Sequence, residues 1–391
     1  RSALVTLEVA LAVTLLVGAG LLVRSLVQLQ RVETGFNADG ILAAEVSLPS
    51  ERYETRADTE RFWTQFLDRV RAIPGVEAAG ATTLLPLRGG GDTYFHIEGQ
   101  PPATDADKMN ATVSTVTDDY FATMRIPMVA GRTFTVTDTE GPGVTVVSDG
   151  LARRLFPGQR ALGRRLVVDF GQPFTAEIVG VVADVRIYGQ VYDAPDVMYF
   201  SNRQPGAGFG TALLMNVAAR VRGNPTAIAP QLRAALRAID PDVPLSAIQP
   251  MNEILADSHG RARFRTQLLT SFAGVALVLA VVGLYGTLAY SVTQRMREIG
   301  VRIALGAQAR AVFGLVLRQG MVLVSIGVVI GVAGAFAVTR LLRAQLFEVT
   351  PTDPIVFVGA GAALLAAGFA ACAVPARRAT RADPIAALRL E

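Results

Sequence analysis

Four long apolar runs constrain this chain more than any other feature of its sequence. The runs are Ala3–Val23, Thr266–Tyr290, Met321–Val338 and Pro354–Val374, and the helix of the third is expected to begin earlier, near Ala311. About 20 helical residues cross a hydrocarbon core of about 30 Å, so each run is long enough to span a bilayer alone. Glu8 is the one charged residue inside them. We therefore expect four transmembrane helices.

Composition supports a membrane protein and excludes several other classes. The chain is 51% hydrophobic and 18% charged, with a mean hydropathy of +0.38, which is too apolar for a wholly soluble chain. Its single cysteine, Cys372, lies in the fourth run, which excludes a disulfide scaffold. The basic excess flanks the apolar runs, and acidic residues slightly outnumber basic ones between Arg24 and Arg265. That distribution argues against nucleic-acid binding.

The short loops indicate the orientation in the membrane. The segment between runs two and three and the tail after run four are rich in arginine: Arg295, Arg297, Arg302, Arg310, Arg377, Arg378, Arg381 and Arg389. The positive-inside rule places both in the cytoplasm. Four spans then put both ends of the chain in the cytoplasm and the long polar segment outside.

This topology divides the chain into seven parts. We expect transmembrane helices over residues 1–27, 263–292, 311–345 and 354–375, an extracytoplasmic domain over 28–262, a cytoplasmic helix over 293–310 and a cytoplasmic tail over 376–391. The first run lacks the basic start of a signal peptide. Because the chain begins without Met, we expect it to be a piece of a longer protein.

Small and charged residues within the runs suggest how the helices pack. Gly327, Gly331 and Ala335 recur every fourth residue, which favours close helix contact in lipid. The spacing does not decide between a contact within one chain and a contact between two copies. Glu8 fits a polar helix contact near the interface, and a proton relay is the less common alternative. Runs two to four offer no ring of charged or amide residues that would line an aqueous pore.

The long polar segment has the pattern of a two-lobed α+β domain. Short alternating strands mix with single helices, and glycine- and proline-rich breaks at Arg88–Asp92 and Gln204–Gly210 are candidate junctions. Thr55 is expected to cap a helix whose buried face includes Phe62 and Phe66. Other expected elements are strands at Ile41–Leu48, Val76–Thr83, Thr112–Thr117, Val144–Ser148, Arg165–Asp169, Ala176–Val185 and Thr211–Val221, and helices at Asp118–Met124, Asp149–Phe156 and from Asn224 to about Ile239.

No catalytic or cofactor motif is present in this segment. His96 and His259 have no cysteine nearby, so no zinc pattern exists. The run Asp257–His259 holds triad residue types, but consecutive side chains point apart. Gly206–Gly210 lies before an expected strand, unlike a dinucleotide loop, and Lys108 follows no glycine loop. We expect no enzyme activity and no cofactor on this chain.

The segment between runs two and three is the most informative. Met296, Ile299 and Ile303 share one helical face, Glu298 precedes Arg302 by four residues, and Gly306 ends the helix. On this pattern alone, such a helix either lies on the membrane surface or docks into a partner.

The segment resembles the coupling helix of FtsX-like ABC permeases, whose usual form is close to R-x-R-E-I-G-[IV]-R-x-A-L-G-A. The matching residues are Arg295, Arg297, Glu298, Ile299, Gly300, Val301, Arg302, Ala304, Leu305, Gly306 and Ala307. Residues 16–25 resemble the first span of that family, residues 119–134, 151–158 and 178–185 its MacB-type periplasmic core domain, and residues 375–389 its C-terminus. The chain is similar in particular to the second half of the duplicated MacB-like permeases of acidobacteria.

This resemblance implies a permease of the bacterial inner membrane that works by mechanotransmission. A separate ABC ATPase would bind ATP-Mg and move the coupling helix, and a second permease unit would complete a dimer or pseudo-dimer. The residues expected to contact the ATPase or shape the helix are Arg295, Arg297, Glu298, Ile299, Gly300, Arg302, Ile303, Leu305 and Gly306. We expect export or extraction of an amphiphile, peptide or lipoprotein. The alternatives are a regulatory transducer and a passive membrane-anchored binding protein without an ATPase.

Overall fold

The computed structural model describes residues 2–102, 104, 107–139, 143–189, 192–204, 212–294, 308–342, 346–347 and 349–380. Contacts divide the chain into two units. One unit combines Arg1–Arg31 with Gly260–Glu391 and is called the helical bundle below. The other is Val32–His259 and is called the polar domain. The chain passes from the bundle into the polar domain once and returns once.

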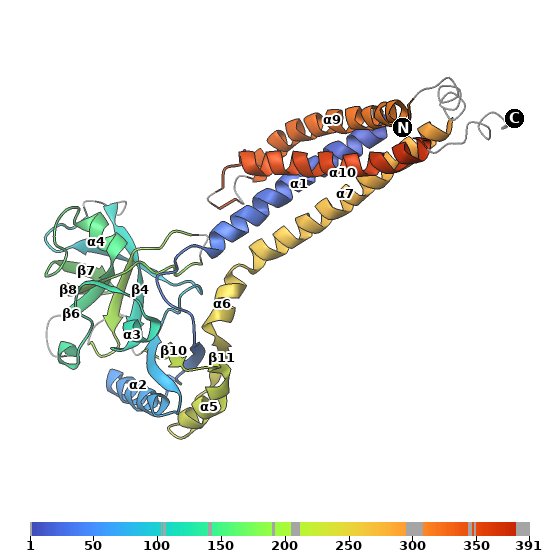
Figure 1. Ribbon diagram of the computed structural model, residues 1–391. Coiled ribbons are helices and arrows are strands. Elements are labelled where there is room, and N and C mark those ends of the chain that lie inside the picture. Colours follow the sequence, from blue (N-terminus) through green and yellow to red (C-terminus); the bar gives the residue numbers. More distant parts are fainter. Residues whose placement is uncertain are drawn as a thin grey trace. The chain divides into compact units, whose positions relative to one another are not determined.

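Four long helices form the bundle (Figure 1). They are α1 (Ser2–Gln30), α7 (Gly260–Gln294), α9 (Ala309–Leu342) and α10 (Pro354–Thr380). Within the described residues, all four are long and apolar enough to cross a membrane, over Ala3–Gln30, Ala262–Gln294, Arg310–Leu341 and Pro354–Arg378. The four expected helices are thus present. α10 runs past the expected end at residue 375 because Pro375 is accommodated inside it.

Helix α1 lies at the centre of the bundle. Its buried residues recur at helical spacing and face the other three helices: Val5, Val9, Ala12, Val13, Val17 and Leu21. By contrast, α7 exposes a row of large apolar side chains that includes Phe272, Val275, Leu279 and Val282. A helix that is apolar on all sides suits a lipid surrounding, where exposed leucine and valine have no cost.

The first lobe of the polar domain is an antiparallel sheet covered by helices. Its strands follow the order β11 (Leu245–Pro250), β1 (Ile41–Ser47), β10 (Leu214–Val221) and β2 (Val76–Thr82). Because successive strand residues face opposite sides, Leu42, Ala44 and Val46 pack in one core and Ile41 and Ala43 in another. The first core contains α2 (Arg56–Arg71) and α5 (Ala229–Arg237), which follows the short helix η3 (Pro225–Ile228).

The second lobe is a closed ring of six strands. In order they are β4 (Met109–Val116), β3 (Asp92–Ile97), β7 (Arg165–Asp169), β8 (Pro173–Val182), β6 (Gly143–Ser148) and β9 (Val197–Ser201), and β9 pairs back onto β4 in parallel. Closure leaves these six strands without an open edge. The short strand β5 (Met128–Gly131) pairs with β8. Two further helical segments, α4 (Asp149–Leu155) and η2 (Val136–Thr139), belong to this lobe.

A seam of one ladder pair and a shared hydrophobic core joins the two lobes. A single residue pair, Thr82 with Val116, links β2 to β4 in the ladder. Beside it, α3 (Tyr120–Met124) lies so close to β2 that a side chain at Gly80 would meet the Tyr120 backbone at 2.7 Å. α6 (Met251–Ser258) covers the same core through Met251 and Ile254. The expected two-lobed α+β domain is confirmed.

Candidate functional site

The coupling segment, residues 295–307, lies outside the described residues. It contains all of the expected ATPase-contacting residues: Arg295, Arg297, Glu298, Ile299, Gly300, Arg302, Ile303, Leu305 and Gly306. The structure describes what flanks the segment on both sides. α7 ends at Gln294 and α9 begins at Ala309, so the segment joins two bundle helices.

A small apolar cluster packs the two helices that flank the coupling segment against α10. Val292 near the end of α7 packs with Val312 and Val316 near the start of α9 and with Ala376 of α10. Next to this cluster, Arg378 donates a hydrogen bond of 2.9 Å to the Tyr285 hydroxyl of α7. The cluster and this hydrogen bond thus connect the end of α7 and the start of α9 to α10.

The small residues of α9 lie against α1 of the same chain. A Cβ atom on Gly327 would come within 2.6 Å of Val9, and one on Gly331 within 2.7 Å of the Ala10 carbonyl oxygen. Ala335, one turn further, is fully buried. Thr14 adds a polar contact, because its hydroxyl donates to the Gly331 carbonyl at 3.2 Å. These close contacts make α1 and α9 a tightly packed pair.

The Glu8 side chain lies against another glycine of the bundle, Gly283 of α7. Its Oε2 atom would be 2.3 Å from a Cβ atom on Gly283 of α7, so the carboxyl group occupies the space that a side chain there would fill. This oxygen is buried and has no hydrogen-bond partner among the described residues. The structure thus places Glu8 in a helix contact between α1 and α7.

The C-terminal end of α1 carries contacts that sequence reasoning missed. Arg24 forms an ion pair of 2.6 Å with Asp353, at the start of α10. The next residue, Ser25, accepts a hydrogen bond of 2.8 Å from the backbone of Phe347. The available signal was an arginine and an aspartate at the ends of two apolar runs, but nothing in the spacing shows that these ends meet.

In the described part of the polar domain, the residues of the Asp257–His259 run make local contacts. Ser258 donates to the carbonyl of Leu255 in its own helix, and Asp257 accepts from Gln249. Burial lowers the pKa of His259. Within the part of the chain that the structure describes, no group of three His, Cys, Asp or Glu side chains is arranged to hold a metal.

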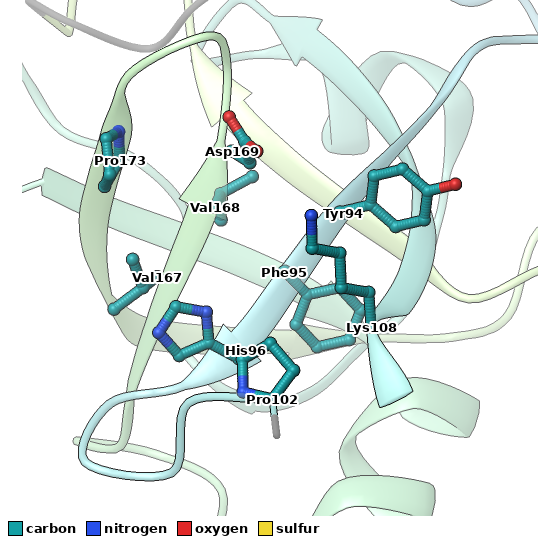
Figure 2. Close-up of a pocket in the computed structure, with 9 residues that line it drawn as sticks. All are labelled: Tyr94, Phe95, His96, Pro102, Lys108, Val167, Val168, Asp169 and Pro173. Carbon is teal, nitrogen blue, oxygen red and sulfur yellow. The ribbon is translucent and has the colours of Figure 1, made fainter. Parts of the chain in front are cut away.

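His96 and Lys108 instead line a small pocket on the second lobe (Figure 2). Phe95 and Val168 form buried parts of its wall, and the Lys108 ammonium lies 5.6 Å from the centre of the Tyr94 ring. The other lining residues are Pro102, Val167, Asp169 and Pro173. The cavity volume is about 150 Å³, whereas pockets for drug-sized ligands have about 300–1,000 Å³. This pocket is therefore too small to enclose a drug-sized ligand.

Two family models match this chain over most of its length. The MacB-like periplasmic core domain matches residues 2–239, and the FtsX-like permease C-terminal region matches residues 270–384. These matches cover the polar domain up to α5, together with α1, most of α7, and helices α9 and α10.

Two of the relatives that are similar in sequence are an ABC transporter permease and an ATP-binding/permease protein. An uncharacterized ABC transporter permease of Bacillus subtilis, YknZ, is 29% identical over 325 residues, which are 82% of this chain and 77% of the relative. The macrolide export ATP-binding/permease protein MacB of Chromobacterium violaceum is 28% identical over 72% of this chain, and the chain spans only 44% of that protein. The periplasmic region of MacB from Actinobacillus actinomycetemcomitans is 12% identical, with a TM-score of 0.39 over 58% of this chain and 95% of that structure.

Proposed function

Because this chain belongs to the family of ABC transporter permeases that join a MacB-like periplasmic core domain to an FtsX-like C-terminal region, we propose that it works by mechanotransmission. A separate ATPase subunit binds the coupling segment and moves it as ATP is bound and hydrolysed. The bundle passes this movement to the polar domain, which exports or extracts an amphiphile, peptide or lipoprotein on the far side of the inner membrane. The chain itself is a non-catalytic permease subunit.

The continuity of α7 is the observation that carries this proposal. This helix is one unbroken element of 35 residues from Gly260 to Gln294. Its first residue follows the last residue of the polar domain, and its last residue precedes the coupling segment. At 1.5 Å per residue it is roughly 50 Å long, more than the hydrocarbon core. A push at Gln294 therefore reaches the polar domain through a hydrogen-bonded helix and not through a loop.

The apolar interior of the bundle favours a substrate path that does not run between the four helices. Its central cluster consists of apolar residues, chiefly valine, leucine and alanine, and a single charged side chain, Glu8, lies beside this cluster between α1 and α7 without forming a row of polar groups. A polar pathway needs charged or hydrogen-bonding groups along its length. The helices that the structure describes instead use their shared interior for packing, which suits the transmission of movement.

A second permease unit completes the proposed assembly. The exposed apolar row of α7, which includes Phe272 and Leu279, would face lipid or the same helix of the second unit. In this arrangement two coupling segments would be held by two ATPase subunits, and their closing would move both polar domains together.

Variants of the coupling segment test the proposal. The full chain would be purified with the ATPase that accompanies it and reconstituted in liposomes, and substrate-stimulated ATP hydrolysis would be measured. Glu298→Ala should reduce the stimulation about tenfold, because truncating a charged interface residue costs about 1.4 kcal/mol or more. Gly300→Pro should abolish it, because proline breaks the helix. Glu54→Ala, at an exposed glutamate of the polar domain, is the matched control.

Normal stimulation in both coupling variants would refute mechanotransmission through this segment. Recovery of the chain without any ATPase, under conditions where its dimer survives, would support the passive binding protein instead. Activation of a cell-wall hydrolase with no transported substrate would support the regulatory transducer.

A further inference from the structure

A larger cavity of the second lobe lies beside the short strand β5. Its volume is about 580 Å³, which falls within the range of about 300–1,000 Å³ for pockets of drug-sized ligands. One wall is Val129–Gly131 of β5, and the other is the end of α4 together with residues 156–162. Val181 of β8, the ladder partner of Ala130, also lines the cavity. This cavity is called the β5 groove below.

The lining of the β5 groove is largely apolar. Ala152, Phe156 and Val181 line it and are themselves buried. Val129 also lines it, and this large apolar side chain is 54% exposed. Apolar surface that remains in contact with water gains free energy when a ligand covers it. The lining therefore suits the apolar part of a ligand.

Backbone hydrogen bonds hold both walls of the groove in place. β5 is paired with β8. On the other wall, the Phe156 amide donates to the Ala152 carbonyl and the Gln159 amide to the Phe156 carbonyl, both at 3.0 Å. A Cβ atom on Gly131 would come within 2.8 Å of Leu162 Cδ2, so the two walls approach each other closely there. The groove is thus formed before any ligand binds.

The charges around the groove are unevenly balanced. Arg153 forms ion pairs with Asp149 at 2.6 Å and with Asp184 at 3.2 Å. Both carboxylates are therefore already in contact with a guanidinium. Arg160 lines the groove and is exposed, and Arg164 is exposed two residues beyond the lining residue Leu162. Neither Arg160 nor Arg164 forms an ion pair with any residue that the structure describes.

Arg164 is held next to the groove by two of its lining residues. Its guanidinium donates a hydrogen bond of 3.2 Å to the Gln159 side chain and lies 5.8 Å from the centre of the Phe156 ring. Two guanidinium groups without a carboxylate partner thus accompany an apolar lining. Guanidinium groups bind carboxylate and phosphate through charge-assisted hydrogen bonds.

We propose that the β5 groove binds the apolar chain of an anionic amphiphile and that Arg160 and Arg164 bind its acidic head group. The inference rests on the proposed function and narrows its substrate class, from amphiphiles, peptides and lipoproteins in general to an amphiphile with an alkyl chain next to an acidic group. A neutral or cationic amphiphile would cover the same apolar lining but would gain nothing from the two arginines.

Photochemical cross-linking tests this binding without any ATPase. The full chain would be placed in nanodiscs of phosphatidylcholine and irradiated with dodecanoate that carries a diazirine near the end of its chain. Cross-linked peptides would be identified by mass spectrometry. The groove segments 129–131 and 152–162 should be labelled in a saturable manner. At equal free concentration, dodecanol and dodecyltrimethylammonium with the same diazirine should label these segments about tenfold less.

Matched variants separate the apolar lining from the charge. Val129→Asp places a carboxylate on the groove wall and should lower the labelling by dodecanoate about tenfold. Val136→Asp, at an exposed valine of the same lobe that does not line the groove, should leave it unchanged. Both variants should keep the thermal stability of the unchanged chain, because both side chains are largely exposed.

The charge is tested at Arg160. Arg160→Glu should raise the dodecanoate concentration needed for half-maximal labelling about fivefold or more, because it replaces a charge-assisted contact by repulsion. Arg160→Lys should stay near the unchanged chain. Arg233→Glu, at an exposed arginine of α5 in the first lobe, is the control and should have no effect.

Three results would overturn the inference. They are labelling confined to the bundle helices, equal labelling of the groove by all three head groups, and unchanged labelling in both Val129→Asp and Arg160→Glu. Any of them, together with a loss of coupling in Glu298→Ala, would refute the anionic amphiphile site and leave the proposed function intact. Normal coupling in Glu298→Ala would refute the proposed function and, with it, the role of the bound amphiphile as a substrate.

Discussion

At the scale of single residues, Arg220 connects three parts of the polar domain. It is almost fully buried in β10, and its guanidinium donates to the backbone carbonyls of Thr123, Asp39 and Asn37 at 2.8, 2.6 and 2.9 Å. Burial lowers the pKa of Arg220, but an arginine stays charged at neutral pH. Arg220 thus connects β10 of the first lobe to α3 at the seam and to the loop that follows α1.

Replacement of this arginine should destabilise the domain. Arg220→Met would leave three carbonyl groups without their donor, and we expect a loss of about 2–4 kcal/mol. Urea unfolding of the full chain in detergent would measure it through the fluorescence of Trp63, which is the only tryptophan and is buried in the first lobe. Arg222→Met, at a highly exposed arginine, should change the stability by less than about 0.5 kcal/mol. Equal effects of the two substitutions would contradict this role of Arg220.

Asp118 at the seam should give the domain a pH-dependent stability. Burial raises the pKa of Asp118, although Arg203 at 3.3 Å opposes this. A carboxyl group whose pKa is raised on folding destabilises the folded state when it is ionised. This penalty should therefore disappear as the pH falls through the raised pKa towards the unfolded value of about 3.9.

The variant Asp118→Asn isolates this effect. It should be more stable than the unchanged chain at pH 7, and the difference should shrink as the pH is lowered to 4. Comparing the two chains at each pH cancels the contribution of other groups, such as Asp240. Burial raises the pKa of Asp240, but the hydrogen bonds from Arg52 and from other donors outweigh burial, so the pKa is lowered. A stability difference that stays constant from pH 7 to pH 4 would show that Asp118 does not titrate in this way.

At the scale of elements, the sequence predicted the helices and strands whose residue pattern lies wholly within the element itself. α2 follows from the Thr55 cap, whose side chain accepts the Asp58 amide, and from the buried row that includes Phe62 and Phe66. The four transmembrane helices follow from length and apolarity alone. In contrast, β9 was missed because its five residues are all buried and show no alternation, and β3 was missed because it begins in an expected junction.

The contacts of the helical bundle likewise include some that the sequence predicted and some that it did not. The spacing of Gly327 and Gly331 predicted close helix packing, since that property is local. Their partner, α1, and the meeting of Arg24 with Asp353 depend on how helices more than 300 residues apart are arranged, which no local pattern contains. The roles of the coupling residues from Arg295 to Gly306 stay predictions.

The contact between α1 and α9 can be tested by a matched pair of glycine substitutions. Gly331→Val would place side-chain atoms where the Ala10 carbonyl and Val13 already lie, and overpacking of this kind costs about 1–3 kcal/mol. Gly359→Val, on α10, has no atom within 4 Å of its new Cβ and should be nearly neutral. Thermal unfolding in detergent compares the two. A neutral Gly331→Val would show that α1 and α9 are not closely packed.

At the scale of the whole molecule, the chain connects two units of different construction. The polar domain is built as two lobes on a hydrogen-bonded network of strands, and the bundle is built from four helices with close contacts at glycine. The chain connects them at the end of α1 and at the start of α7. The proposed transmission across the membrane requires the coupling segment and the polar domain to lie on opposite sides of the membrane.

Labelling of single cysteines shows on which side of the membrane each part of the chain lies. In a Cys372→Ala background, Glu51→Cys reports on the polar domain, and Gln308→Cys reports on the residue next to the coupling segment; both positions are exposed. A membrane-impermeant maleimide would be added to spheroplasts before and after permeabilisation. We predict that Glu51→Cys is labelled in intact spheroplasts and that Gln308→Cys is labelled only after permeabilisation. Labelling of both cysteines from the same side would contradict mechanotransmission by this chain.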